Sequence, residues 1–174
     1  MKIYRKIIPR IAKDVVRALL ANQAIEIEDG HRDEAELDVA SVFVRYLNEL
    51  EQLNEDAKEA LERHNLSHEA LGRVKSSLAE KRNLVIGTES LEYVLGAVIS
   101  GLFNSEHILE IFAEDHEMRQ MVHTTIGKYL GVDSELDREV RHRLKNLREG
   151  TAEWEVEYTR LIDQMRGHKL EEQL

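Results

Sequence analysis

The sequence predicts a mainly all-α protein, a helical bundle made of two related halves of about 83 residues, 1–87 and 88–174. Apolar or small side chains recur between Leu136 and Met165 at steps of three and four, the period that places them on one helical face. A weaker copy of this pattern lies 83 positions earlier, between Leu53 and Leu78. The chain also has a single proline, which favours long helices.

Composition limits the class of protein. Hydrophobic residues make up 42% of the chain and charged residues 33%, a balance typical of a globular helical protein rather than of a disordered one. Cysteine is absent, which excludes disulfides, thiolate metal sites and a cysteine nucleophile, and is compatible with the cytoplasmic location that we predict. Charged residues interrupt the apolar runs well short of the roughly 18–20 residues that span a bilayer, so we expect no membrane span.

The first elements of the chain are a helix, a strand and a turn. The helix is predicted from about Tyr4 to Asn22, with Pro9 in its first turns, where proline is tolerated. Residues 24–28 alternate apolar and acidic side chains, the period of a short strand. The Asp-Gly pair at 29–30 is a turn signal.

Three further helices complete the predicted first half. The second helix begins at a capping pattern over residues 33–36, and the chain turns near Asn54 into a third helix, Glu55–Arg63. Residues 64–67 form a break, and a fourth helix follows from His68 to about Leu84.

The second half repeats this order. It begins with a helix over Leu91–Asn104 and a strand over residues 108–112. The next helix, Asp115–Leu130, is expected to end at Gly131, and the long segment after it should be interrupted at residues 148–150.

The two short strands, 24–28 and 108–112, are predicted to pair as an antiparallel ribbon between the halves. Since an isolated two-stranded ribbon is marginally stable, the pair needs helices to cover it. Each half could instead form a separate four-helix unit. We favour one helical body, because no Gly-, Pro- or Ser-rich linker separates the halves.

The net charge of −10 predicts that the whole molecule is repelled by nucleic acid and by anionic lipid. One stretch near the N-terminus is basic, and its residues are Lys2, Arg5, Lys6, Arg10, Lys13 and Arg17. The simpler interpretation is a solvated face paired with acidic neighbours. The alternative is a docking face for a phosphate backbone or an acidic partner, in which Lys6, Arg10 and Lys13 are the candidate residues.

The chain contains a pair of histidines with a spacing suited to metal binding. His116 and His123 are seven residues apart on one predicted helical face, with Glu114 and Asp115 nearby, and are candidate metal ligands. An acid-rich helix N-terminus explains the same residues without a metal. We therefore assign no cofactor.

Several segments resemble a known family. They are MKIYRKIIPRIAKDVVRALL at the start, IEIE after it, Tyr46-Leu47, LDREVRHRL from Leu136 and AEWEVEYTRLIDQM from Ala152. Together they are similar to the bacterial family catalogued as domain of unknown function 507, over about residues 1–169. The resemblance implies a bacterial, cytoplasmic, mostly helical protein, and it supplies no catalytic or binding residues.

The functional prediction follows from the lack of catalytic motifs. We expect a non-enzymatic interaction or scaffold protein, a homodimer being one form of it, with Trp154, Tyr158 and Met165 on the partner-binding face. The same aromatic residues could instead be internal anchors. The alternatives from other classes are a nucleic-acid-associated protein that uses the basic N-terminal stretch and a metal-dependent enzyme that uses His116 and His123.

Overall fold

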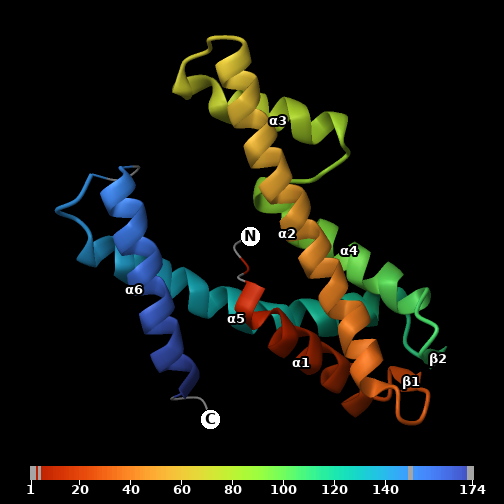
Figure 1. Cartoon of the computed structure of the whole chain (residues 1–174). Helices are drawn as coiled ribbons and strands as arrows, with labels where there is room; N and C mark the ends of the chain where they lie inside the picture. Colours follow the sequence, from red (N-terminus) through yellow and green to blue (C-terminus); the bar gives the residue numbers. More distant parts are fainter. Residues whose placement is uncertain (1–2, 4, 149–150, 172–174) are drawn as a thin grey trace. The chain divides into compact units, whose positions relative to one another are not determined.

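The computed structural model describes residues 3, 5–148 and 151–171, and it is mainly helical, as predicted (Figure 1). Its elements in chain order are the 3-10 helix η1 (Arg5–Ile7), α1 (Ile8–Ala21), β1 (Ile25–Ile27), α2 (Arg32–Arg63), η2 (His68–Ala70), α3 (Leu71–Lys81), η3 (Gly87–Glu89), α4 (Ser90–Phe103), β2 (Ile108–Ile111), α5 (Asp115–Arg143) and α6 (Ala152–Glu171). The chain divides into two compact units, Ile3–Ile126 and Gly127–Leu174, and α5 contributes residues to both.

The first unit is built on α2, which packs against α1, α3 and α4. The apolar stripe of α1 faces this core, because residues three and four apart share one side of a helix. Pro9 lies in the first turn of α1, as predicted, whereas Tyr4, the expected start of the helix, lies outside the described residues. The buried side chains of α1 are Ile8, Ile11, Ala12, Val15, Val16 and Leu19.

The helix α2 is continuous, so the break predicted near Asn54 is wrong. Leu53 and Ala57 lie before and after Asn54 and are four residues apart, so they share one face of the helix. Both are buried. Asn costs a helix interior only about 0.7 kcal/mol relative to Ala, less than the burial of one large apolar side chain contributes. The helix also begins at Arg32, so Asp33 lies in its first turn and not at its cap.

The break after α2 occurs where it was predicted. Asn65 adopts a φ of 48°, the left-handed conformation that asparagine tolerates better than most residues. The chain then returns along α2 through η2 and α3. Tyr46 on α2 holds the segment after α3, because its hydroxyl donates a hydrogen bond of 3.0 Å to the carbonyl of Val85. Burial raises the pKa of Tyr46, which extends to higher pH the range over which the hydroxyl is a donor.

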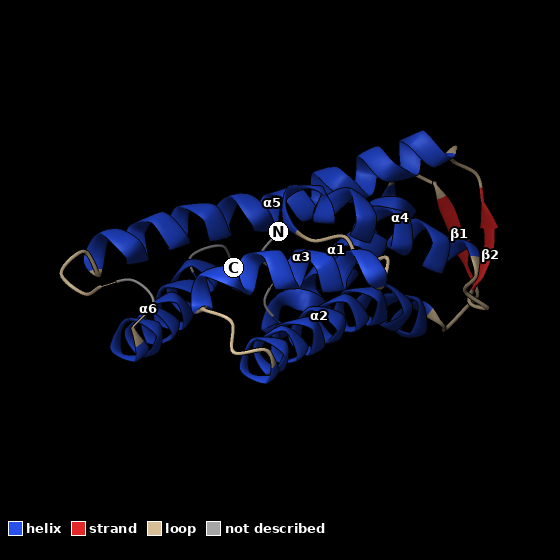
Figure 2. Ribbon diagram, turned by 90° about the horizontal axis from the view of Figure 1, so that it is seen from above, coloured by secondary structure: helices blue, strands red, loops and turns tan. Residues whose placement is uncertain are grey.

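The strands β1 and β2 pair in antiparallel fashion, which confirms the predicted ribbon (Figure 2). Ile25 lies opposite Ile111, Glu26 opposite Glu110 and Ile27 opposite Ile108, so Leu109 is an extra residue in a bulge. β1 contacts α1, and β2 contacts α4. These helices provide the cover that a two-stranded ribbon needs.

A glycine allows α4 to approach α2 closely. A Cβ atom built on Gly101 would lie 3.3 Å from the Cγ2 atom of Val42, which is tighter than ordinary van der Waals contact. Val98 and Leu102, on either side of Gly101 in the sequence, are buried, so the glycine lies within a packed helix face.

The helix α5 runs through Gly131, so the helix end predicted there is wrong. Glycine costs a helix interior about 1 kcal/mol relative to Ala. Leu136 and Val140, four residues apart, are buried further along the same helix, and their packing outweighs that cost. The predicted interruption of the following segment is confirmed, because α5 ends at Arg143 and α6 begins at Ala152. Glu149 and Gly150 lie outside the described residues.

Residues 83 positions apart are buried alike in the first unit. Val15 and Val98 form one such pair, and Leu19 and Leu102 form another. The duplication into residues 1–87 and 88–174 stays a prediction. Within the residues that the structure describes, no helix combines the length and the apolar character required to cross a membrane.

Candidate functional site

Three side chains with metal-ligand chemistry meet at one end of the ribbon. Glu28 follows β1, His31 directly precedes α2, and His107 directly precedes β2. One ligand atom from each residue lies within 4.8 Å of the other two. The imidazole rings of His31 and His107 are stacked, with centroids 5.2 Å apart and planes inclined by 10°. Glu28 is exposed, and both histidines are half-buried.

Backbone hydrogen bonds hold these three residues together. The backbone N–H of Glu28 donates to the carbonyl of His107 at 3.0 Å, which extends the pairing of the strands by one step. The N–H of His31 donates to the carbonyl of Glu28, also at 3.0 Å. The turn between Glu28 and His31 contains Gly30 at a φ of 83°, a conformation in which glycine is favoured. The backbone therefore fixes the spacing of the three Cα atoms.

The segment before β2 is also attached to α2. The Ser105 hydroxyl donates to Oδ2 of Asp38 at 2.5 Å, and it accepts the backbone N–H of His107 at 3.2 Å. Asp38 lies in the second turn of α2, seven residues after His31. Since His31 directly precedes α2, this connection ties the backbone of both histidines to the same helix.

A carboxylate and the ring nitrogens of two histidines can bind a divalent cation. His31 Nδ1 lies 3.5 Å from Oε2 of Glu28 and 3.2 Å from the carbonyl oxygen of Asp29. The group could therefore also be a small network of hydrogen bonds around one imidazole.

The outer face of the ribbon carries a second feature. Glu26 and Glu110 lie directly opposite each other, and both are exposed. Leu109 is 60% exposed and Phe112 is 57% exposed beside them. Ile25 and Ile27 stand on either side of Glu26, Ile111 lies between Glu110 and Phe112, and Ile25 is buried. The two sides of the ribbon thus differ in chemistry, and the outer side combines acidic and apolar groups.

The predicted metal ligands on α5 lie apart from the ribbon group. His116 and His123 are both exposed, and Nδ1 of His116 lies 3.3 Å from Oε2 of Glu114. Among the described residues, neither histidine belongs to a group of three potential ligands. Their role in metal binding stays a prediction.

The basic stretch lies on η1 and α1. Lys6 and Lys13 are exposed, and Arg10 is half-buried, whereas Lys2 lies outside the described residues. Acidic neighbours take up some of this charge. Nη2 of Arg5 lies 2.8 Å from Oε2 of Glu51, and Nη1 of Arg17 lies 3.3 Å from Oδ1 of Asp14.

Two of the three predicted partner-binding residues of α6, Trp154 and Tyr158, contact α5 within the second unit. Trp154 is 8% exposed, and its ring stacks on Tyr158 with a centroid distance of 4.8 Å. The Arg141 guanidinium lies 5.5 Å from the Trp154 ring centroid, and the Tyr158 hydroxyl donates a hydrogen bond to Asp137. These contacts favour the alternative interpretation of both aromatics as internal anchors. Met165 is half-buried.

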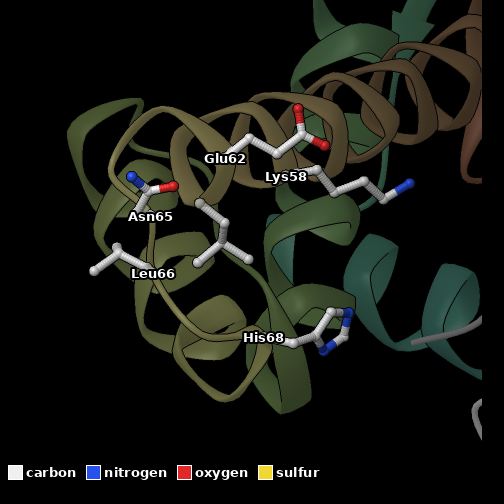
Figure 3. Close-up of a pocket in the computed structure, with 6 residues that line it drawn as sticks. Lys58, Glu62, Asn65, Leu66 and His68 are labelled. Carbon is white, nitrogen blue, oxygen red and sulfur yellow. The ribbon is translucent and has the colours of Figure 1, made fainter.

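A shallow pocket of about 510 Å³ lies at the far end of α2. Its lining residues are Lys58, Leu61, Glu62, Asn65, Leu66 and His68 (Figure 3). Apart from Leu61 these side chains are exposed, and the polar groups of Lys58, Glu62 and His68 do not converge on one point in the close-up. Ligand sites usually bury most of a ligand among apolar side chains, so we assign this pocket no ligand.

The fold defines a mainly helical protein whose short strands, far apart in the sequence, pair into a ribbon. The chain belongs to the family described as "Protein of unknown function (DUF507)", whose family model matches residues 1–169. This confirms the resemblance noted in the sequence. A comparison with curated proteins found no match.

The group of Glu28, His31 and His107 was not predicted from the sequence. No motif marks it, because 75 residues separate the two histidines in the chain. The predicted pairing of the strands was the available signal. Antiparallel pairing places the residue that follows β1 beside the residue that precedes β2.

Proposed function

We propose that this chain is a non-enzymatic interaction module, and that the outer face of its ribbon binds a protein segment in which Lys or Arg lies beside apolar residues. The observation that carries the proposal is the exposed pair of Glu26 and Glu110. Like charges directly opposite each other on neighbouring strands destabilise a ribbon. A basic side chain placed between the two carboxylates would remove that repulsion.

The exposed apolar residues support the same partner. Leu109 directly precedes Glu110 in β2, Phe112 directly follows the strand, and each exposes more than half of its surface. Aromatic and aliphatic side chains of this kind are the usual anchors of protein interfaces. The bulge that contains Leu109 directs an additional apolar side chain outward. A partner that offers both charge and apolar contact therefore fits this face better than a highly charged polymer does.

The net charge favours a basic partner as well. An overall charge of −10 attracts positively charged segments over long range and repels nucleic acid. The proposal replaces α6 with the ribbon as the binding surface, because Trp154 and Tyr158 already contact α5 residues. A homodimer, nucleic-acid binding through Lys6, Arg10 and Lys13, and a cytoplasmic location stay predictions.

Site-specific photocross-linking in the parent cells tests the proposal. A photoreactive phenylalanine analogue is placed at Phe112, and the matched control carries it at Leu66, another exposed apolar residue. We expect the Phe112 probe, but not the Leu66 probe, to label one protein segment that contains Lys or Arg beside apolar residues. The Glu26→Lys/Glu110→Lys variant should lose this product. A product that is unaffected by the charge reversal, or a labelled segment that is acidic, would contradict the proposal.

A further inference from the structure

We infer that Glu28, His31 and His107 form a binding site for one divalent transition-metal ion of the zinc class. The inference concerns the end of the ribbon and not its outer face, and it does not depend on the proposed partner. Its chemistry is that of two imidazoles and one carboxylate, a ligand set that binds zinc and leaves a fourth position for water.

The separation of the three groups suits such an ion after small movements. Their ligand atoms lie within 4.8 Å of one another. In a tetrahedral site with metal–ligand distances of about 2.0–2.1 Å, neighbouring ligand atoms are roughly 3.3 Å apart. The ligand atoms therefore need to approach by about 1.5 Å at most. Rotation of exposed Glu28 and a tilt of the two stacked rings can provide this change while the backbone stays in place.

The backbone around the site is held in advance. The bonds from Glu28 N–H to the His107 carbonyl and from His31 N–H to the Glu28 carbonyl fix the spacing of the ligands. Ser105 connects the N–H of His107 to Asp38 on α2. Because these bonds use backbone groups, Ser105 and Asp38 and none of the ligand atoms, binding has to order side chains alone, which lowers its entropic cost.

An ion at this position would join three elements. It would connect the end of β1 and the start of α2, which are close in the sequence, to the start of β2, which lies far from both. A two-stranded ribbon is marginally stable, so a bond across its end would hold the strands in register. The proposed role is therefore structural, as a clip that fixes the ribbon.

Competition between the protein and a chromophoric zinc chelator tests the inference. The protein is used without a histidine tag, is stripped with EDTA and is titrated with Zn²⁺. We expect one Zn²⁺ per chain, and the His31→Gln and His107→Gln variants should bind it at least about 100-fold more weakly, since loss of a direct ligand costs more than loss of a supporting group. Glu28 is exposed, so Glu28→Gln keeps the fold while removing the carboxylate, and it should also weaken binding.

The matched controls are His116→Gln and His123→Gln, which alter exposed histidines on α5. They should bind Zn²⁺ like the unaltered chain, and Co²⁺ should give the same order of affinities with an absorption spectrum typical of nitrogen and oxygen ligands. Circular dichroism identifies any variant that fails to fold. If a histidine variant fails to fold, the Zn²⁺ affinity of Glu28→Gln decides whether the site exists. The absence of stoichiometric Zn²⁺ binding, unchanged binding by Glu28→Gln, or loss of binding in the α5 controls would overturn the inference.

Discussion

The imidazole of His107 lies flat against that of His31, with ring centroids 5.2 Å apart, although α2, α3 and α4 separate the two residues in the chain. The pairing of β1 with β2 and the contact between Ser105 and Asp38 together produce this arrangement. The positions of His31 and His107 thus depend on Ser105, which is not itself one of the proposed metal ligands.

Removal of that support should weaken zinc binding. In Ser105→Ala, the N–H of His107 loses its acceptor and Asp38 loses its donor. We expect the affinity for Zn²⁺ to fall by about 10- to 100-fold, the usual effect of removing a group that positions a ligand. Chelator competition measures the change. Ser76→Ala is the control, because that hydroxyl donates to the Gly72 carbonyl within α3. Equal affinities in the two variants would contradict the positioning role.

Two helical glycines should respond in opposite ways to substitution. No atom lies within 4 Å of a Cβ built on Gly72, so Gly72→Ala should stabilise the chain by about 0.5–1 kcal/mol through helix propensity. A Cβ built on Gly101 would lie only 3.3 Å from the Cγ2 atom of Val42, so Gly101→Leu should destabilise the chain by about 1–3 kcal/mol through overpacking. Urea unfolding followed by circular dichroism measures both. Destabilisation of similar size in the two variants would show that the close approach of α4 to α2 is not the cause.

The single tryptophan reports on the second unit. Trp154 is buried against Tyr158 and Arg141, so Trp154→Ala should cost about 3–5 kcal/mol of stability in that unit. Trp154→Phe keeps an aromatic ring and should cost clearly less. Hydrogen exchange of the α5 and α6 amides measures the loss, and the fluorescence of Trp154 in the unaltered chain should shift to the red on unfolding. If Trp154→Ala accelerated exchange only in amides of the first unit, Trp154 would not be an anchor of the second unit.

Acid should weaken the contact between α2 and the end of α3. Hydrogen bonds from Arg82 and Gln52 hold the pKa of Asp56 below its usual value. An aspartate with a lowered pKa stabilises the folded state above its ordinary pKa, and this contribution is lost as the pH falls through the folded pKa. Asp56→Asn should therefore show a smaller loss of stability on acidification than the unaltered chain does. Urea unfolding at a series of acidic pH values measures this, with Glu69→Gln as the exposed control. Identical acid profiles for Asp56→Asn and the unaltered chain would contradict it.

Local pattern was sufficient to predict much of the fold. The alternation at residues 24–28 and the apolar run at 108–112 identified both strands, and their pairing followed from the proposed relation between the halves. The left-handed Asn65 ended α2 as expected. The predictions at Asn54 and Gly131 were wrong, because each residue costs a helix no more than about 1 kcal/mol and buried neighbours outweigh it.

The candidate sites were harder to predict, because long-range pairing creates them. His107 has no neighbour in sequence that marks it as a ligand, and it meets His31 through the ribbon. The exposed pair of Glu26 and Glu110 likewise depends on the register of the strands. A shift of one residue would place each side chain on the opposite face, and the sequence alone does not fix a register that includes a bulge.

The most direct test of the ribbon as a docking surface is a charge exchange with the cross-linked segment. The labelled segment is made as a peptide, together with a second peptide in which its basic residues are changed to Glu. Binding of each peptide is measured for the unaltered chain, for Glu26→Lys/Glu110→Lys and for the control Glu69→Lys/Glu80→Lys. We predict that reversing the charges of the ribbon alone, or those of the peptide alone, abolishes binding. Reversing both should restore it, and the control variant should bind the original peptide like the unaltered chain. Failure of the paired reversal to restore binding, or equal loss in the control, would contradict the account.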